Sequence, residues 1–589
     1  MQHLRTKTQL RQFMLFTALL FSGACQQDPA FLLDFGNSRL EVIINGQTYA
    51  SDSTYNWGNA STDSPITING TLRNRSSFAI TLAGSPLIAV GGANSSEISV
   101  SQPAGSVLTA GASENFTITV TPHSAFSRSA KITILSTPGS DVYTLNLSGY
   151  RHGLVMVRDV NSGAGSASPS FLRIIGSTLY FRANDGTNGA ELWKSDGSRD
   201  GTTLIKDINA GAGNSNPYGF TSFGGIVLFA ATDAATGTEL WKTDGTLAGT
   251  ALVADINGGA ASSSPSAGSG PFIVLGGRAI FCATTTAAGE ELWSTDGTSA
   301  GTTLIQDLNP GTADGCRTPV FAHNANYVVF SGETATDGRE LYRSSGVAGN
   351  LSMIHNIYPG ASNANPTDFF SFGGVTVFQA NDGTNGSELW KTNGTPTSAS
   401  MVANIRPGLS SGNPQNFAVV NNTLLFMARH DTNGYELWSS TSALTGATFL
   451  KDINVGAGDS LPEFITPLGS SALFKACASA TDCELWISDT TGPGTVLLKD
   501  INPGGAASSN PANLTVVGSL IYFAATDGVN GIELWRSDGT ETGTYMVADI
   551  NPGAASSSPG NLTPYGGSLY FTATTAANGT ELFLYVAPP

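Results

Sequence analysis

Short apolar runs separated by polar turns recur through the C-terminal three quarters of the chain. In the segment 513–550 these runs cover residues 513–517, 520–525, 532–537 and 545–550. β-Branched, aromatic and aliphatic residues fill the runs, and Gly, Asn and Asp separate them, which indicates strands joined by turns. The second and third runs are apolar at consecutive positions, so both faces of the sheet are expected to be covered. No window has the apolar stripe of a helix, and the unit is therefore predicted to be a small four-stranded sheet.

A Glu-Leu-aromatic motif marks the third run of each unit and occurs nine times. Its aromatic residues are Trp193, Trp241, Trp293, Tyr342, Trp390, Trp438, Trp486, Trp535 and Phe583. The spacing of 48–52 residues between successive members indicates one supersecondary unit repeated along the chain. A four-stranded sheet that is covered on both faces and repeated at this period is typical of a propeller blade.

The order of the runs predicts how the repeat region closes. It opens with a lone fourth strand at 154–160 and ends after a third strand at 581–585. The opening strand is expected to complete the last sheet, which would leave no open sheet edge. We therefore predict that residues 151–589 form a large β-propeller of about nine four-stranded blades closed by its N-terminal strand. Two smaller rings or an open superhelical array also fit nine units.

The region 38–150 lacks the repeat and carries about seven strand-like runs in about 110 residues. This density of short strands favours an Ig-like β-sandwich. The fold class predicted for the whole chain is therefore all-β, with a sandwich followed by a propeller.

Both regions resemble known families. The motif Trp535-Arg536-Ser537-Asp538-Gly539-Thr540 resembles the bacterial ELWxxDGT repeat, and 193–197 fits it as well, whereas the units at Tyr342, Trp438 and Trp486 depart from it after the aromatic residue. This resemblance covers about 151–589 and implies a secreted or lipid-anchored propeller-type protein, with no catalytic residues to carry over. The N-terminal region is similar to the hydin-type (choice-of-anchor-D) domain through 71–74, 116–122 and 145–149. Such domains usually act as spacers or adhesive modules.

The first residues are predicted to be a targeting segment. Arg5, Lys7 and Arg11 precede an apolar run at 13–20, which is too short to span a bilayer as a helix. The following Ser22-Gly23-Ala24-Cys25 resembles a bacterial lipoprotein signal, which implies a signal peptide at 1–24, lipidation of Cys25 and a tether at 25–37. Ordinary secretion with cleavage nearby is the alternative. Gln26 favours delivery to the outer membrane over the inner membrane, so we expect a lipid-anchored protein of the cell envelope, with surface exposure left open.

The other four cysteines are even in number, which fits an exported protein with disulfides. Cys477 and Cys483 bracket the hairpin between the second and third strands of one unit, where a cross-hairpin disulfide is expected. Cys282 and Cys316 lie in adjacent units and are candidates for a second disulfide. No CxxC motif is present, so a zinc site is not predicted.

Charge excludes some partners. The net charge is −17 and only 12% of the residues are charged. Nucleic acid attracts basic patches, so nucleic-acid binding is not expected, and direct binding to anionic lipid headgroups is disfavoured. Contact with the membrane is therefore predicted through the N-terminal lipid only, and the chain is expected to be a monomer.

The repeated Glu and aromatic residues are interpreted as structural. Catalysis needs one or two carboxylates in distinct environments, whereas this Glu recurs in every unit. We expect the Glu column to bond backbone or a neighbouring strand and the Trp column to pack between blades. The members singled out are Glu191, Trp193, Glu239, Trp241, Glu291, Trp293, Glu388, Trp390, Glu436, Trp438, Glu484, Trp486, Glu533 and Trp535.

The hairpin loops that begin at Asp185, Asp382 and Asp527 offer oxygen ligands and are weak calcium candidates. Calcium prefers 6–8 oxygen ligands, and each loop supplies few carboxylates. Turn chemistry is therefore the preferred interpretation, and no cofactor is predicted. The histidines occupy unrelated positions of the repeat, so no Ser-His-Asp arrangement is nominated.

The leading functional prediction is a non-enzymatic, lipid-anchored envelope protein whose propeller binds a protein or glycan ligand. This prediction depends on the near-equivalence of the units, none of which has an acidic, His or Cys cluster that the others lack. Loops on a rigid scaffold commonly carry binding sites. The first alternative is a carbohydrate-active or other hydrolytic propeller with carboxylates at the central channel. The second alternative is a structural surface component.

Overall fold

The computed structural model describes residues 39–60, 65–92, 95–121, 126–137, 141–151, 153–266, 271–504 and 507–587. The signal peptide, the tether and Cys25 lie outside these residues. The described chain consists of strands and one short 3-10 helix, η1 (Ser95–Glu97), so the all-β prediction is confirmed. Among the described residues no helix is long and apolar enough to cross a membrane.

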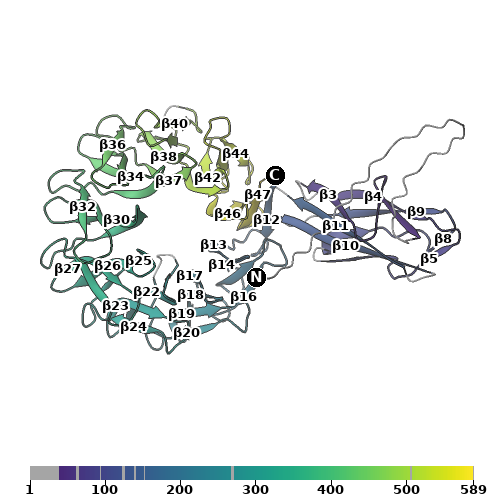
Figure 1. The fold of residues 1–589 in the computed structure, drawn as a ribbon, viewed down its shortest axis with the longest axis horizontal. Coiled ribbons are helices and arrows are strands. Elements are labelled where there is room, and N and C mark those ends of the chain that lie inside the picture. The colour runs from purple at the N-terminus through teal and green to yellow at the C-terminus, as the bar shows by residue number, and fades with distance from the viewer. Residues whose placement is uncertain are drawn as a thin grey trace, which may run out of the picture.

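The N-terminal region forms two facing sheets (Figure 1). One sheet has the order β2-β1-β4-β9-β7, and the other has the order β3-β11-β10-β5-β8 with β6 also paired to β10. The strands are β1 (Leu40–Ile44), β2 (Gln47–Tyr49), β3 (Thr54–Ala60), β4 (Ile66–Asn74), β5 (Ile80–Leu82), β6 (Ile88–Gly91), β7 (Ile98–Val100), β8 (Val107–Leu108), β9 (Ser113–Val120), β10 (Phe126–Thr137) and β11 (Asp141–Arg151).

Alternating positions of these strands form the core between the two sheets. Ile68 and Leu72 of β4 are buried together with Ile118 of β9, while Asn69 and Arg73 face outward. Gly70 occupies an inward position of β4 because a Cβ there would lie 2.2 Å from the Phe116 ring. The ring of Phe116 thus fills the space that a larger residue at position 70 would need.

The C-terminal region is a ring of nine four-stranded sheets within the described residues (Figure 1). Each sheet is antiparallel, and in eight of them the four strands follow one another in sequence order. The strands are β12 (Gly153–Arg158), β13 (Ser170–Ile175), β14 (Thr178–Asn184), β15 (Ala190–Ser195), β16 (Thr203–Lys206), β17 (Tyr218–Phe223), β18 (Ile226–Asp233), β19 (Gly237–Thr243), β20 (Ala251–Ala254), β21 (Ile273–Leu275), β22 (Arg278–Thr285), β23 (Gly289–Thr295), β24 (Thr303–Gln306), β25 (Cys316–Ala322), β26 (Val328–Thr334), β27 (Gly338–Ser344), β28 (Leu351–His355), β29 (Thr367–Phe372), β30 (Val375–Asn381), β31 (Ser387–Thr392), β32 (Ser400–Ala403), β33 (Gln415–Val420), β34 (Thr423–His430), β35 (Gly434–Thr441), β36 (Thr448–Lys451), β37 (Glu463–Leu468), β38 (Ser471–Ser479), β39 (Asp482–Ser488), β40 (Val496–Lys499), β41 (Ala512–Val517), β42 (Leu520–Thr526), β43 (Ile532–Ser537), β44 (Tyr545–Ala548), β45 (Gly560–Tyr565), β46 (Ser568–Thr575) and β47 (Gly579–Val586).

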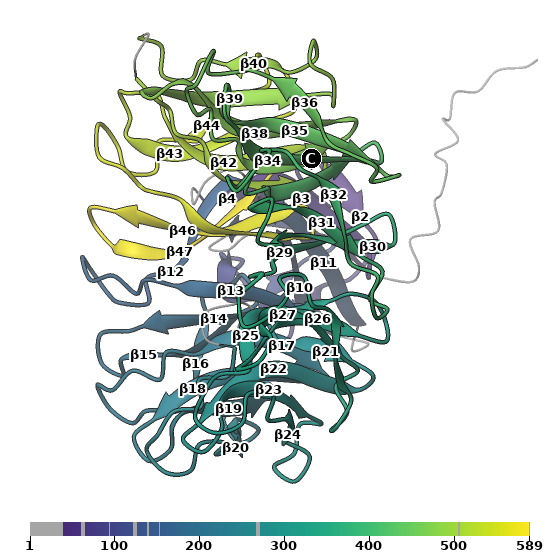
Figure 2. The same ribbon diagram turned by 90° about the vertical axis from the view of Figure 1, so that its left-hand side faces the viewer.

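The ninth sheet combines the two ends of the repeat region. Its order is β12-β47-β46-β45, and β12 pairs antiparallel with β47 through partners such as Val155 and Leu584. Figure 2 shows β12 beside β46 and β47, with β13 following on the other side. The first strand of the ring therefore completes the sheet begun by the last three strands.

The hydrophobic core of the ring lies between neighbouring sheets. Leu192 and Ile205 of one sheet pack in a cluster with Phe229 and Trp241 of the next. A fully buried aromatic residue recurs at the position of Phe229 in the second strand of every sheet. Because apolar residues on both faces of a sheet contact neighbouring sheets, the consecutive apolar positions of the sequence are explained by this arrangement.

Candidate functional site

The repeated Glu of each sheet bonds the crossover that leads to the next sheet. Glu191 is fully buried, and its carboxylate accepts hydrogen bonds from the Ile208 amide at 2.7 Å, the Ser215 amide at 2.7 Å and the Ser215 hydroxyl at 2.6 Å. Equivalent bonds are made by Glu239, Glu291, Glu340, Glu388, Glu436, Glu484, Glu533 and Glu581. The carboxylates of the Glu column thus bind the backbone amides of the crossovers, and their role is structural.

Burial raises the pKa of these carboxyl groups in spite of the hydrogen bonds. Desolvation is the largest influence, and the amide donors oppose it. The pKa is raised to about 7 at five members, namely Glu291, Glu340, Glu388, Glu436 and Glu581. A raised pKa in this column follows from burial and is no sign of catalysis.

The aromatic column is buried between the sheets. Trp193, Trp241, Trp390, Trp438, Trp486 and Trp535 are 5–9% exposed, and Trp293 is partly buried. Their indole Nε1 atoms have no hydrogen-bond partner within the described residues. The column therefore contributes apolar packing and presents no surface to a sugar.

The three calcium candidates lie on three different sheets and are not brought together. The Asp185 carboxylate accepts from the Thr187 amide at 2.9 Å and from the Asn188 amide and side chain at 2.8 and 2.7 Å. Burial tends to raise the pKa of Asp185, but the bonds from Asn188 and Thr187 outweigh it and hold the pKa below its usual value. Asp382 and Asp527 make the same turn. Among the described residues no group of three or more His, Cys, Asp or Glu could hold a metal ion.

Two disulfides join the remaining cysteines. Cys477 and Cys483 link β38 to β39 with a Cα–Cα distance of 3.8 Å. Cys282 of β22 and Cys316 of β25 link neighbouring sheets with a Cα–Cα distance of 5.9 Å. Arg317, the residue after Cys316, occupies the position that proline holds in other crossovers, for example at Pro217 and Pro366.

A cluster of charged residues lies at the crossover around Cys316, between the sheets of β23 and β27. Arg317 Nη1 contacts Asp314 Oδ2 at 3.0 Å, and Arg317 Nε contacts Glu333 Oε2 at 3.4 Å. Arg339 Nη2 contacts the same Glu333 oxygen at 2.7 Å. The Glu290 backbone amide donates to Asp314 Oδ1 at 2.9 Å. Asp314 and Arg317 both influence the pKa of the Glu290 carboxyl group, so this third carboxyl group lies near them. We call Glu290, Asp314, Arg317, Glu333 and Arg339 the charged cluster.

The hydrogen bond between the Glu290 amide and the crossover recurs in the other sheets, but the cluster's combination of charged side chains does not. In other sheets the amide equivalent to that of Glu290 donates to Asn214, Ser262, Asn363, Ser411, Asp459, Ser508, Ser556 or Ser166. The residue equivalent to Glu290 is Ala190, Thr238 or Ser387 in three of these sheets. An acidic side chain on both sides of this hydrogen bond is found only at Glu290 and Asp314 among the described sheets.

The electrostatic environments of the two neighbouring carboxyl groups differ. Burial raises the pKa of Glu290, the negative Asp314 raises it further, and Arg317 opposes both. Asp314 is about one-third exposed and is ion-paired to Arg317. The pKa of the nearby Tyr218 is also raised, by burial first and then by Glu239 and Glu290. The charged cluster therefore holds a carboxyl group whose pKa is raised by burial next to one that is ion-paired to an arginine.

Sequence reasoning missed the charged cluster. Its members come from β23, the crossover, β25, β26 and β27, and none belongs to the repeated motif. The signal that could have found them is departure from the repeat, since Arg317 replaces a proline and Glu290 is the acidic residue at a position that is Ala190, Thr238 or Ser387 in other units.

None of the three histidines in the described ring is part of a catalytic triad in which it could activate an accessible hydroxyl as a nucleophile. His323 Nδ1 lies 2.6 Å from the Thr376 hydroxyl, but Thr376 is fully buried. His430 Nδ1 bonds Thr432 at 2.9 Å in an exposed hairpin, and His355 Nδ1 is buried without a partner within the described chain. No Ser-His-Asp arrangement is present among the described residues.

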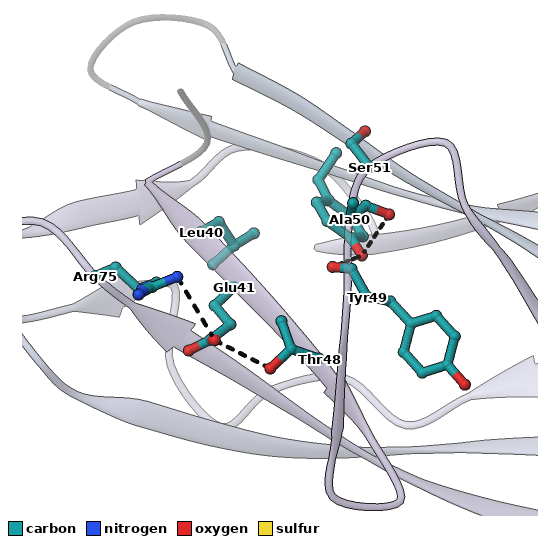
Figure 3. Close-up of a pocket in the computed structure, with 8 residues that line it drawn as sticks. Leu40, Glu41, Thr48, Tyr49, Ala50, Ser51 and Arg75 are labelled. Atoms are coloured by element: carbon teal, nitrogen blue, oxygen red, sulfur yellow. Dashed lines mark hydrogen bonds and ion pairs between the residues drawn. The ribbon is translucent and has the colours of Figure 1, made fainter. Parts of the chain in front are cut away.

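A small cavity lies in the N-terminal region between β1, β2 and β11 (Figure 3). Glu41 accepts from Thr48 Oγ1 at 3.1 Å and lies 3.8 Å from Arg75 Nη1, and Tyr143 donates to the Tyr49 carbonyl at 2.8 Å. Its volume of about 20 Å³ is close to that of a single water site. The cavity is thus too small for an organic ligand.

Comparisons with known proteins give structural likeness at low identity. A scan against family models and a search of curated proteins gave no match. A puromycin hydrolase is 12% identical with a TM-score of 0.33, covering 63% of this chain and 60% of that chain. A structure from a study of two prolyl endopeptidases is 12% identical with a TM-score of 0.35, and the match covers 62% of this chain and 55% of that chain. A quinonprotein alcohol dehydrogenase-like protein from Bacteroides thetaiotaomicron gives 12% identity and a TM-score of 0.31, covering 78% and 97%.

The prediction of a non-enzymatic binding scaffold is corrected. The first solved structures that resemble the chain are a puromycin hydrolase and prolyl endopeptidases, although the match spans less than two thirds of those chains. The physical reason lies in this chain: the prediction depended on having no odd acidic cluster, and Glu290, Asp314 and Glu333 form one. The ring itself is an all-β, propeller-like fold.

Proposed function

We propose that the nine sheets are blades of one closed β-propeller of the ELWxxDGT type, preceded by an Ig-like sandwich of the hydin type. The support is the pairing of β12 with β47 and the repeated bond from Glu to crossover in every sheet. The motif around Trp535 carries the resemblance to the repeat family. A cryo-electron or crystal structure with any other number of sheets around one axis would refute this architecture.

We propose in addition that the protein is lipid-anchored to the bacterial cell envelope, at the outer membrane, through Cys25. The sequence Ser22-Gly23-Ala24-Cys25 after a short apolar run supports this location. Metabolic labelling with a palmitate analogue tests it. Label is expected in the wild-type chain and is expected to be lost in Cys25→Ser.

For the activity, we infer that the chain is a hydrolase acting on glycosidic bonds at the charged cluster. The observation that carries this inference is that two acidic residues outside the repeated motif are neighbours: the Glu290 backbone amide donates to Asp314, and Asp314 raises the pKa of the Glu290 carboxyl group. Glycoside hydrolysis commonly uses two carboxyl groups, one protonated and one ionised. We assign this pair to Glu290 and Asp314, because burial raises the pKa of the Glu290 carboxyl group and Asp314 is ion-paired to Arg317.

In the proposed reaction Glu290 donates its proton to the glycosidic oxygen as the bond from that oxygen to the anomeric carbon breaks. Asp314 faces the developing positive charge on the sugar ring and accepts a proton from the attacking water. The oxygen of this water forms the new bond to the anomeric carbon, so one water is consumed for each bond cleaved. Arg317 and Arg339 position the carboxylates and offer donors to sugar hydroxyls.

The test is a panel of nitrophenyl glycosides and bacterial polysaccharides incubated with the purified chain. Glu290→Gln and Asp314→Asn are expected to lower kcat by roughly 10²–10⁴-fold, which is the usual contribution of a positioned acid or base. Asp314→Asn keeps the oxygen that accepts from the Glu290 amide, as Asn214 does in another sheet.

The matched control is Asp459→Asn. Asp459 accepts from the Tyr435 amide at 2.9 Å in the same frame, but the residue equivalent to Glu290 there is a tyrosine. Unchanged activity is expected in this variant. No hydrolysis by the wild-type chain, or full activity in Glu290→Gln, would contradict the proposal.

A further inference from the structure

The N-terminal region has an exposed apolar patch at the end farthest from the ring. Val107, Leu135 and Val142 are 54%, 41% and 56% exposed. Figure 1 shows β5 and β8 at this far end, while β12 enters the ring at the opposite end. We call Val107, Leu135 and Val142 the distal patch.

The strand register places these three side chains on one face. Leu135 of β10 is the register partner of Val142 of β11. Val107 of β8 is the partner of Thr81, and Thr81 is the partner of Thr137, two residues beyond Leu135 on β10. Register partners share a face, and residues two apart on a strand share a face. The distal patch therefore lies on the outer face of its sheet, with threonines and no charged residue between its members.

The described chain also begins at this end. Arg39 is the first described residue, its guanidinium lies 5.0 Å from the centre of the Phe78 ring, and its carbonyl accepts from the Arg75 amide at 2.9 Å. Phe78 is 42% exposed. Asn74 donates to the carbonyls of Phe78 and Leu108, which places the chain start next to β8. The first described residue therefore lies at the same end of the sandwich as the distal patch.

The segment between Cys25 and Arg39 is short enough to keep the sandwich close to a membrane that holds a lipidated Cys25. Cys25 lies 14 residues before Arg39, and a chain of that length spans at most about 50 Å. The same segment contains four apolar residues, Phe31, Leu32, Leu33 and Phe35. Arg73 and Arg75 flank the chain start with side chains about half exposed, and such residues can keep their charge at an interface while their stems lie against lipid.

We propose that the distal patch inserts into the interface of the bilayer that holds the lipidated N-terminus. The interaction would be apolar, so it does not need anionic headgroups and is compatible with the net charge of −17. It fixes which end of the sandwich meets the membrane and directs the ring away from it. This inference builds on the proposed lipid anchor, but it concerns a second contact that the lipid does not make.

The test uses the chain from Gln26 onward, which carries no lipid, with zwitterionic phosphatidylcholine vesicles in a flotation assay. The wild-type chain is expected to float with the vesicles. The triple variant Val107→Ser, Leu135→Ser and Val142→Ser is expected to lose about tenfold or more in vesicle partitioning, since each side chain removes apolar area from the contact. Thermal melting checks that the variant is folded.

The matched control replaces three exposed apolar residues of the ring, Leu247, Val347 and Val529, which are 65%, 57% and 69% exposed. Its partitioning is expected to equal that of the wild type. Because the lipid is absent in every arm, failure of the Cys25 proposal does not affect this result.

Three outcomes would overturn the proposal. The first is no flotation of the wild-type chain. The second is equal flotation of the distal variant and the wild type, with loss only when residues 26–38 are deleted, which would assign the contact to that segment alone. The third is a dimer in light scattering that the distal variant abolishes without vesicles, which would assign the patch to a second copy of the chain.

Discussion

The Val160 amide nitrogen lies 3.0 Å from Oε2 of Glu581, although the two residues are 421 positions apart in the chain. Glu581 also accepts from the Asn161 amide at 3.2 Å and the Ala167 amide at 3.2 Å. The same bonds connect Glu191 to Ile208 within one continuous stretch of chain. The junction between the two ends of the ring therefore uses the same carboxylate contact as every other junction.

Removing the carboxylate at the junction is expected to destabilise the ring. In Glu581→Ala the buried amides of Val160 and Ala167 and the partly buried amide of Asn161 lose their acceptor, and each unsatisfied buried donor costs about 1–3 kcal/mol. We expect a loss of at least about 2 kcal/mol in the free energy of unfolding, measured by chemical denaturation. Thr580→Ala is the control, because that neighbour is partly exposed and its hydroxyl bonds only Thr574. A loss in Glu581→Ala no larger than in the control would contradict this assignment.

The Glu column is expected to make the ring less stable as pH rises. The folded-state pKa of Glu388 is raised to about 7, above its ordinary value of 4.5, because burial favours the protonated form. The folded state thus binds more protons than the unfolded state between these values, so stability is greatest below about pH 4.5 and falls as pH rises towards about 7. Melting temperatures from pH 4.5 to pH 8 check the slope. Glu388→Gln is expected to have a shallower slope, and an unchanged slope in that variant would exclude Glu388 as a source.

The disulfide between neighbouring sheets is expected to matter more than the one within a hairpin. Cys282 and Cys316 are 34 residues apart, and Cys477 and Cys483 are 6 apart. Loop-closure entropy assigns about 4 kcal/mol to the longer loop and about 2 kcal/mol to the shorter one. Serine pairs at each disulfide, compared by denaturation, measure the difference. A larger loss from the hairpin pair would contradict the expectation.

A single methyl group at Gly70 is expected to disrupt the N-terminal sandwich. The added Cβ would lie 2.2 Å from the Phe116 ring, which is itself buried in the core. Gly70→Ala should cost about 1–3 kcal/mol, the usual range for overpacking. Gly91→Ala is the matched control, since nothing lies within 4 Å of a Cβ there. Proteolysis of the N-terminal region at increasing temperature distinguishes the two, and equal resistance would refute the packing argument.

The strands of the ring are predictable from the sequence because each unit repeats the same apolar pattern. The runs at 513–517, 520–525 and 532–537 correspond to β41 (Ala512–Val517), β42 (Leu520–Thr526) and β43 (Ile532–Ser537). The fourth run is two residues longer than β44 (Tyr545–Ala548), because Asp549 already accepts from the crossover. Four strands per unit is therefore a confirmed prediction.

The sandwich was harder to predict. The sequence predicts about seven strands here, and the described residues of this region contain eleven. Strands β2 (Gln47–Tyr49) and β3 (Thr54–Ala60) carry few aliphatic residues and so give no strand signal of their own. β3 pairs parallel with β11, and the partner that gives it strand structure lies some 90 residues later in the chain. Such pairing leaves no local signal.

The candidate site was missed for a related reason. Glu290 and Asp314 meet across a crossover, so their contact depends on how two sheets are placed. The repeat draws attention to what all units share, whereas the site consists of side chains found in one place. Comparing each unit with the others position by position would have singled out Glu290 and Arg317.

The pairing of β12 with β47 also has a consequence for how the protein is made. A ribosome adds about 5–20 residues per second, so β12 must wait roughly 20–80 s for the partner strand that lies some 420 residues later. During that time the edge of β12 lacks the strand it will finally pair with. A chain that is truncated before β47 cannot close the ring, so β12 keeps an unpaired edge. A protease could recognise this unpaired strand and so distinguish truncated molecules from complete ones.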